Sequence, residues 1–193
     1  MPRTITRHWQ EFKRPIVTYT FHQEEPKAHI TIITVPPGSD WSSLLHWHET
    51  HREFLEIVQG TALVTVGSTT RSYTASDGVI TVERGVLHEW QRDPDDKQVL
   101  VVEEWTDPAD GEKELFFRNL CSSMLDLKVH KLQMGGLAGR LPLDWVDVLQ
   151  IFVIFGAYDN YPVMYRGPLM KVSTRIVLFL TGWIGLALGF KAR

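Results

Sequence analysis

Cysteine is almost absent from this 193-residue chain, which contains only Cys121. A single thiol cannot form an internal disulfide, which fits a reducing compartment but does not exclude a secreted protein without disulfides. Residues 1–19 also lack an apolar segment of the length found in signal peptides. We therefore expect a cytoplasmic protein.

The sequence also lacks a strong excess of charge of one sign, since its formal net charge is −3. Without a basic excess, nucleic acid is not expected as a partner. No Ser-His-Asp set, phosphate-binding glycine loop or CxxC pair is apparent, and we find no internal repeat or low-complexity segment. What remains is one sizeable folded domain, with or without an appendage.

Short segments rich in β-branched residues, separated by turn residues, fill the first half of the chain. Strands are predicted at 16–21, 28–35, 44–48, 53–58, 61–66, 79–82, 87–91 and 99–105. Residues 1–15 are interpreted as an arm that ends at Pro15, and 67–72 as a turn. Turns every few residues favour an all-β barrel or sandwich over a βαβ fold.

The composition changes at Asp107-Pro108, after which helical periodicity replaces alternation. Helices are predicted at about 111–127, 143–158 and 168–190. The expected organisation is an N-terminal arm with the first strand (1–27), a β-barrel (28–106) and a helical region (107–193).

Four residues with good metal-ligating side chains lie between positions 46 and 88: His46, His48, Glu53 and His88. Residues i and i+2 of a strand face the same side, so His46 and His48 project together, about 7 Å apart along the chain. Glu53 follows after a tight turn, and His88 comes from a separate strand. Three imidazoles and one carboxylate would hold a divalent transition metal with coordination positions left open.

The spacing of these residues resembles the two sequence boxes of the cupin superfamily. The first box, G-x5-HxH-x3,4-E-x6-G, is matched by His46, His48, Glu53 and Gly60, while Gly38 lies two residues further upstream than the pattern prefers. The resemblance covers roughly residues 28–105. It implies a double-stranded β-helix, or jelly-roll barrel, and a bound metal that is often Fe, Mn, Ni or Zn.

The second box, G-x5-PxG-x2-H-x3-N, is matched by Gly78, Gly85 and His88. This sequence departs from it by one residue fewer after Gly78, by Glu83 in place of the proline and by Arg92 in place of the asparagine. The loop before His88 is therefore expected to differ in shape, but no metal ligand is missing.

Three further residues lie near the predicted site. Trp90 shares strand parity with His88, so it either stacks on a hydrophobic or aromatic substrate or packs in the core. His51 lies in the turn before Glu53; we expect it to be exposed, with a role as a nearby acid or base as the alternative. Glu56 is out of phase with Glu53 and is expected to lie outside the site.

The favoured function is that of a metal-dependent enzyme acting on a small organic substrate. Iron or copper would suit oxidation with O₂, whereas Lewis-acid chemistry would suit isomerisation, cyclisation or decarboxylation. The segments 46–60 and 77–90, with the apolar tail, resemble small cupin oxidoreductases of fungal polyketide gene clusters that make salicylaldehyde-type metabolites. That resemblance implies a polyketide intermediate as substrate, with short-chain dehydrogenases and a reducing polyketide synthase as pathway partners. The alternative is a non-catalytic barrel that binds a ligand. The resemblance to cupins, which are often dimers, also implies that this protein is a homodimer.

The C-terminal region contains the most apolar run of the chain, since residues 176–190 carry no charge between Arg175 and Lys191. From Tyr161 to the end there are five basic residues and no acidic one. As a helix the run would be about 22 Å long, short of the roughly 30 Å of a bilayer core. Three interpretations remain open: packing on the barrel or in a homodimer interface, membrane-surface or shallow hairpin association through 142–193, and a single span.

Overall fold

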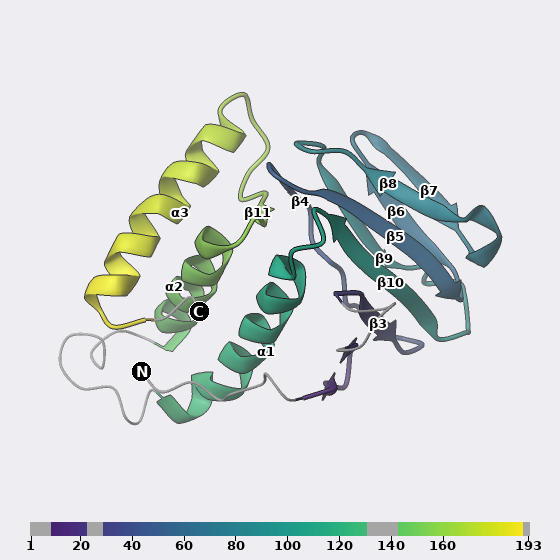
Figure 1. Cartoon of the computed structure of the whole chain (residues 1–193), viewed down its shortest axis with the longest axis horizontal. Helices are drawn as coiled ribbons and strands as arrows, with labels where there is room; N and C mark the ends of the chain where they lie inside the picture. Colours follow the sequence, from purple (N-terminus) through teal and green to yellow (C-terminus); the bar gives the residue numbers. More distant parts are fainter. Residues whose placement is uncertain (1–8, 23–28, 131–142, 191–193) are drawn as a thin grey trace. The chain divides into compact units, whose positions relative to one another are not determined.

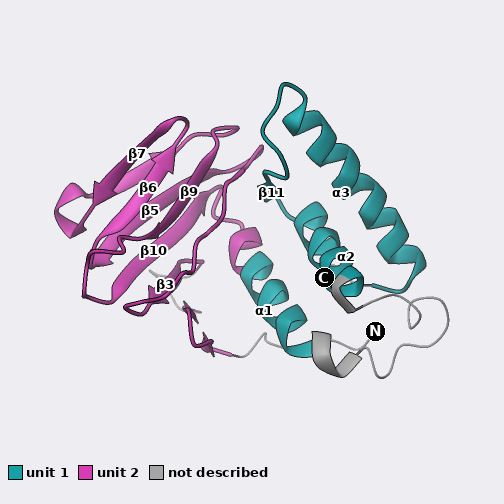
Figure 2. Ribbon diagram, turned by 180° about the vertical axis from the view of Figure 1, so that it is seen from behind, with its two compact units in different colours: residues 1–8, 115–193 teal, residues 9–114 magenta. Residues whose placement is uncertain are grey.

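The computed structural model describes residues 9–22, 29–130 and 143–190 (Figure 1). Two compact units are present, one of residues 9–114 and one that contains the helical residues from Leu115 onward (Figure 2). Part of the predicted arm (1–8) and the predicted break after the first helix (131–142) lie outside the described residues.

Ten strands make up most of the first unit. They are β1 (Glu11–Lys13), β2 (Thr18–Phe21), β3 (Thr31–Val35), β4 (His46–Trp47), β5 (Arg52–Gln59), β6 (Ala62–Val66), β7 (Thr69–Tyr73), β8 (Val79–Val82), β9 (His88–Arg92) and β10 (Leu100–Asp107). One 3-10 turn, η1 (Ala75–Asp77), precedes β8.

The strands pair in a nested order. The innermost pair is the hairpin of β6 and β7, around which β5 pairs with β8, β4 with β9 and β3 with β10, all antiparallel. Rolling up this long hairpin gives two sheets, in the orders β1-β2-β3-β10-β5-β8 and β4-β9-β6-β7. This is the double-stranded β-helix, or jelly roll, and the predicted fold class is confirmed.

Alternation along the strands places one set of side chains in the interior. In β10 every second residue from Leu100 is buried, and β3 and β9 follow the same period of two. Fully buried apolar side chains such as Ile33, Leu55 and Val102 form the core. Each contributes about 1.5–3 kcal/mol of transfer free energy. The same alternation turns the ligating side chains inward.

Two strands of the first unit were not predicted, and neither was the two-residue strand at Tyr161–Pro162. β7 occupies most of the segment interpreted as a turn, and β1 lies in the part interpreted as an arm. Nearly all of β7 is exposed, so it carries no apolar alternation and is held by backbone pairing with β6. β1 has three residues and is held by pairing with β2.

The helices are α1 (Glu112–His130), α2 (Leu143–Ala157) and α3 (Met170–Ala187), with a short strand, β11 (Tyr161–Pro162), before α3. These bounds agree with the three predicted helices to within a few residues. α2 and α3 form a hairpin whose backbones approach closely at two glycines. A Cβ on Gly185 would clash with Val153, and one on Gly156 would lie 3.3 Å from the backbone of Leu178.

Candidate metal centre

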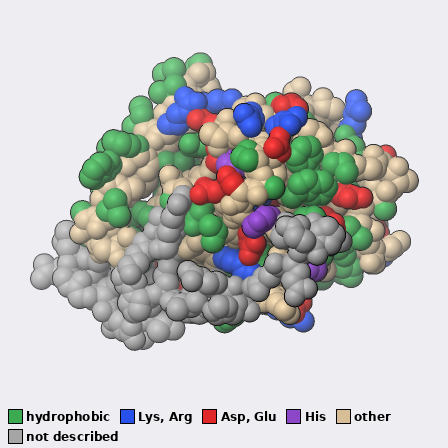
Figure 3. Space-filling view, in the orientation of Figure 1, with side chains coloured by type: hydrophobic (Ala, Val, Ile, Leu, Met, Phe, Trp, Pro, Cys, Tyr) green, Lys and Arg blue, Asp and Glu red, His purple; other side chains and the backbone are tan. Residues whose placement is uncertain are grey.

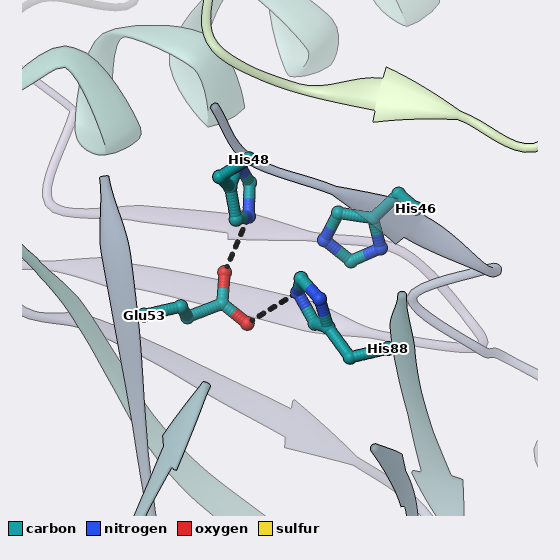
Figure 4. A group of neighbouring side chains, drawn as sticks. All are labelled: His46, His48, Glu53 and His88. Atoms are coloured by element: carbon teal, nitrogen blue, oxygen red, sulfur yellow. Dashed lines mark hydrogen bonds and ion pairs between the residues drawn. The ribbon is translucent and has the colours of Figure 1, made fainter. Parts of the chain in front are cut away.

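The four predicted ligands converge inside the β unit from three different strand regions. His46 lies on β4 with His48 just after it, Glu53 lies on β5 and His88 on β9 (Figure 4). His46 and His88 are direct partners in the β4–β9 ladder, and their ring centroids are 4.1 Å apart. One ligand atom from each of the four residues lies within 4.8 Å of the others.

Backbone geometry at the two ends of the site explains this convergence. Gly85 has a φ of 75°, and its amide donates to the carbonyl of His48 at 2.6 Å. That bond ties the turn before β9 to the end of β4, so the loop that departs from the family pattern at Glu83 still delivers His88. A positive φ favours glycine at position 85.

Two imidazoles are held in place by hydrogen bonds from Nδ1 to backbone carbonyls. The Nδ1 atom of His46 lies 2.7 Å from the carbonyl oxygen of Leu44, and that of His88 lies 2.9 Å from the carbonyl oxygen of Val86. Because a carbonyl oxygen only accepts, each Nδ1 donates its hydrogen, and each Nε2 keeps its lone pair for a metal. Such outer partners commonly orient metal-bound histidines.

The carboxylate of Glu53 lies between two of the rings and is fully buried (Figure 4). Its Oε2 lies 2.9 Å from Nε2 of His48, and its Oε1 lies 3.1 Å from Nε2 of His88. The second pair is an ion pair when His88 is protonated, but neither atom has a hydrogen-bond partner among the described residues. Buried polar atoms rarely remain in this state, and an ion between them would satisfy both. The residues present fit a metal.

The pKa shifts of two of the three rings agree with this role. Burial is the main reason that the pKa of His46 is well below its usual value and that of His48 is below it, so both rings are neutral near pH 7. Burial also acts to lower the pKa of His88, but the Glu53 carboxylate outweighs it and raises that pKa. A neutral imidazole is the form that binds a metal.

Two buried charged residues beside the site were missed from the sequence. Lys113, in the first turn of α1, forms ion pairs with Oε2 of Glu53 and, at 2.6 Å, with Oε1 of Glu104. The other oxygen of Glu104 accepts a hydrogen bond of 3.2 Å from Nε1 of Trp90. A sequence signal existed for Glu104, which occupies an inward position of β10 in register with Leu100 and Val102. None existed for Lys113.

The pKa values of this cluster reflect burial opposed by pairing. Burial would raise the pKa of Glu53, but Lys113 and His88 hold it well below its usual value. Burial and the charge of Glu53 raise the pKa of Glu104 to about 7. Burial would lower the pKa of Lys113, yet Glu104 and Glu53 raise it. Lys113 is therefore a fixed positive charge next to the metal ligands.

The remaining predicted residues occupy defined places. The prediction that His51 is exposed is wrong: it is buried, with Nε2 3.1 Å from Oδ2 of Asp110 and Nδ1 2.9 Å from Oγ1 of Thr50. Trp90 points into the barrel, where its ring lies 4.8 Å from that of Trp41. Glu56 faces outward, as predicted.

Arg92 stands where the family pattern has asparagine. It is buried, and its guanidinium donates to the backbone carbonyls of Asp96 and Gln98. Arg92 therefore closes the loop between β9 and β10 and does not take part in the ligand cluster.

Comparisons with known proteins give relatives at low identity. No family model matches the chain. Among curated proteins, "Probable oxidoreductase patJ" of Penicillium expansum is 26% identical over 151 residues, which are 76% of this chain and 43% of that protein. The protein of the same name from Aspergillus clavatus gives the same values. The chain thus spans less than half the length of these curated relatives.

Solved structures similar to the chain include cupin domains. The CENP-C cupin domain of Drosophila melanogaster has a TM-score of 0.41 at 16% identity and covers 50% of this chain and 73% of its own. The oxalate decarboxylase of Lactobacillus farciminis has a TM-score of 0.38 at 22% identity, with coverages of 49% and 29%. These likenesses are partial, and the jelly-roll assignment rests on the nested strand pairing itself.

Proposed function

We propose that this chain is a metal-dependent enzyme in which His46, His48, Glu53 and His88 hold one divalent ion. The supporting observation is that Oε1 of Glu53 and Nε2 of His88 face each other at 3.1 Å, buried and without hydrogen-bond partners among the described residues. The donor set of three imidazoles and one carboxylate suits Fe, Mn, Ni, Cu or Zn and leaves coordination positions for water or substrate. Bound there, the ion would supply Lewis-acid or redox chemistry.

The chain's own residues set the geometry of the ligands. Lys113 engages Oε2 of Glu53, so Oε1 is the oxygen directed toward His88. Glu104 holds Lys113 on one side and the indole of Trp90 on the other. We assign Lys113 and Glu104 as positioning residues, and Trp90 as an aromatic surface for a hydrophobic or aromatic substrate. His51, bonded to Asp110, remains a candidate acid or base.

For the reaction, we propose an oxidoreductase step on a small substrate of the polyketide type, with a salicylaldehyde-like product. Two considerations support this choice: the curated relatives are named probable oxidoreductases, and the two ligand segments resemble those of cupin oxidoreductases from fungal polyketide clusters. The same site also suits an isomerase, cyclase or decarboxylase, which would need no oxidant. Oxygen consumption during turnover would distinguish the two classes.

The test is the metal content of the purified protein together with that of ligand variants. Wild type is expected to contain about one equivalent of metal, and His48→Ala and His88→Ala to lose both metal and product formation. Glu56→Gln is the matched control, since Glu56 lies on the same strand as Glu53 but faces outward. Full activity of both histidine variants would overturn the metal mechanism. In a separate experiment, metabolite profiling of a deletion strain would identify the substrate.

A further inference from the structure

Helix α3 has two apolar faces, of which only one is covered. Its buried residues, Thr174, Leu178 and Gly185, lie on the side that packs against α2. The opposite side carries exposed large apolar residues at helical spacing: Val172, Ile176, Phe179, Leu180, Trp183 and Ile184. We call these six residues the outer face of α3. A surface helix of a soluble protein normally turns polar residues to solvent there.

The outer face is large and continuous. Phe179 and Trp183, one turn apart, are 65% and 63% exposed, and their rings are in edge contact at 6.2 Å. Figure 3 shows hydrophobic side chains gathered over α3 with few charged ones among them. Trp145 on α2 is 71% exposed and adds a further aromatic ring to the hairpin. Exposed apolar patches of this kind mark interaction sites.

An apolar groove runs beside the outer face, between α2 and α3. It has a volume of about 260 Å³ and is lined by residues that include Val153, Leu178, Phe179, Trp183 and Leu186. Gly182 also lines it, and a side chain there would meet no atom within 4 Å. The groove is therefore open at Gly182, and the side chains that line it are apolar.

The charge around the outer face is positive. Five basic residues and no acidic ones occur from Tyr161 to the end, against three acidic residues between 143 and 160. Arg166 and Arg175 are exposed; Arg175 lies on α3 next to Ile176 in the sequence, and Arg166 lies shortly before the helix begins. Long basic side chains can keep their charge in water while their stems cover apolar surface.

We propose that the outer face of α3 docks in the plane of a lipid bilayer whose headgroups are anionic, with the groove taking part of an acyl chain. Apolar side chains, exposed tryptophans and flanking basic residues are the chemistry of helices that lie in a membrane interface. Basic residues near the surface favour the anionic cytoplasmic leaflet. This surface is independent of the proposed metal chemistry.

Two other occupants fit the observations less well. By length and composition α3 could also cross a membrane, but its 18 residues give about 27 Å, near the lower limit for a bilayer core, and the packing of one side on α2 leaves a single apolar face for lipid. A symmetric dimer through the outer face would cover the apolar side chains but gives no role to the basic residues that flank them.

The experiment is flotation of the full-length protein with neutral phosphatidylcholine vesicles and with vesicles containing 30% phosphatidylserine. Wild type is expected to float with both, more strongly with the anionic ones. Phe179→Gln/Trp183→Gln should weaken binding at least about 100-fold, because two large apolar side chains are lost from the contact. Arg166→Gln/Arg175→Gln should weaken binding to anionic vesicles by about 30-fold and leave neutral vesicles unaffected.

The matched control is Val58→Gln/Val79→Gln, which changes two exposed apolar residues of the β unit and should float like wild type. Failure of wild type to float with either vesicle would overturn the proposal. So would equal flotation of the Phe179/Trp183 variant. A wild-type dimer in light scattering that this variant converts to a monomer, without vesicle binding, would assign the outer face to a second copy.

Discussion

The β unit and the hairpin of α2 and α3 place their polar and apolar side chains in opposite ways. In the β unit, Glu53, Glu104 and Lys113 are buried at the centre. In the hairpin, Phe179 and Trp183 are exposed. Each arrangement costs free energy in the isolated chain, because buried charge loses hydration and exposed apolar surface orders water. Both costs are consistent with the occupants proposed above, an ion inside the barrel and lipid outside the hairpin.

The largest effect on stability is expected from a substitution that leaves a buried charge without its partner. Lys113→Met removes the cation that pairs with Glu53 and Glu104 and should lower the free energy of unfolding of the metal-free protein by about 3–5 kcal/mol. Metal binding should become tighter, because a positive charge beside the ion is lost. Urea denaturation with and without metal measures both effects.

The control for this change is the double variant Lys113→Met/Glu104→Met. Replacing both members of a buried pair by apolar residues of similar size costs less than removing one. The double variant should therefore be more stable than Lys113→Met alone. If it is less stable, the pairing of Lys113 with Glu104 is not what the single variant breaks.

The four ligands could be predicted because the relevant geometry is local. Alternation along a strand puts His46 and His48 on one side and Glu56 away from Glu53, whatever the rest of the fold does. Lys113 could not be predicted, since it reaches Glu53 across 60 positions of sequence from a helix start. Strand β7 was missed for a different reason: its exposed residues carry no pattern, and only its backbone pairing with the neighbouring β6 makes it a strand.

The sequence also described α3 by composition without fixing its surroundings. Fifteen uncharged residues predict an apolar helix. Which side of that helix α2 covers depends on Gly156 and Gly185, because these two glycines permit the close approach of the two helices. The exposure of Phe179 and Trp183 follows from that packing and not from their hydrophobicity.

Glu104 should give the stability of the metal-free β unit a distinctive pH dependence. Its pKa rises from 4.5 to about 7 on folding, so ionisation of Glu104 disfavours the folded state as pH rises through that window. Stability should fall by about 3 kcal/mol between pH 4.5 and 7 relative to Glu104→Gln, which cannot ionise. The comparison with Glu104→Gln subtracts the histidines, which titrate in both proteins. Parallel pH profiles of the two proteins, from urea denaturation, would contradict the assignment.

Smaller changes in stability, of opposite sign, are expected when alanine replaces each of two glycines that lie one turn apart on α3. Gly185→Ala places a Cβ against Val153 and should destabilise the protein by about 1–3 kcal/mol through overpacking. Gly182→Ala meets no atom within 4 Å and should stabilise it by up to about 1 kcal/mol through helix propensity. Thermal denaturation of the two variants tests whether α2 covers the side of α3 that carries Gly185.

The smallest effect on stability is expected for a substitution on the outer face of α3, in contrast to one in the core. Phe179→Gln should change the free energy of unfolding by less than about 0.5 kcal/mol in lipid-free buffer, because the side chain is already 65% exposed. Leu55→Ala, a fully buried control in the barrel, should cost about 2–5 kcal/mol in the same denaturation assay. A large loss for Phe179→Gln would mean that Phe179 is buried in the folded protein in solution. The outer face would then already be covered before any bilayer is present.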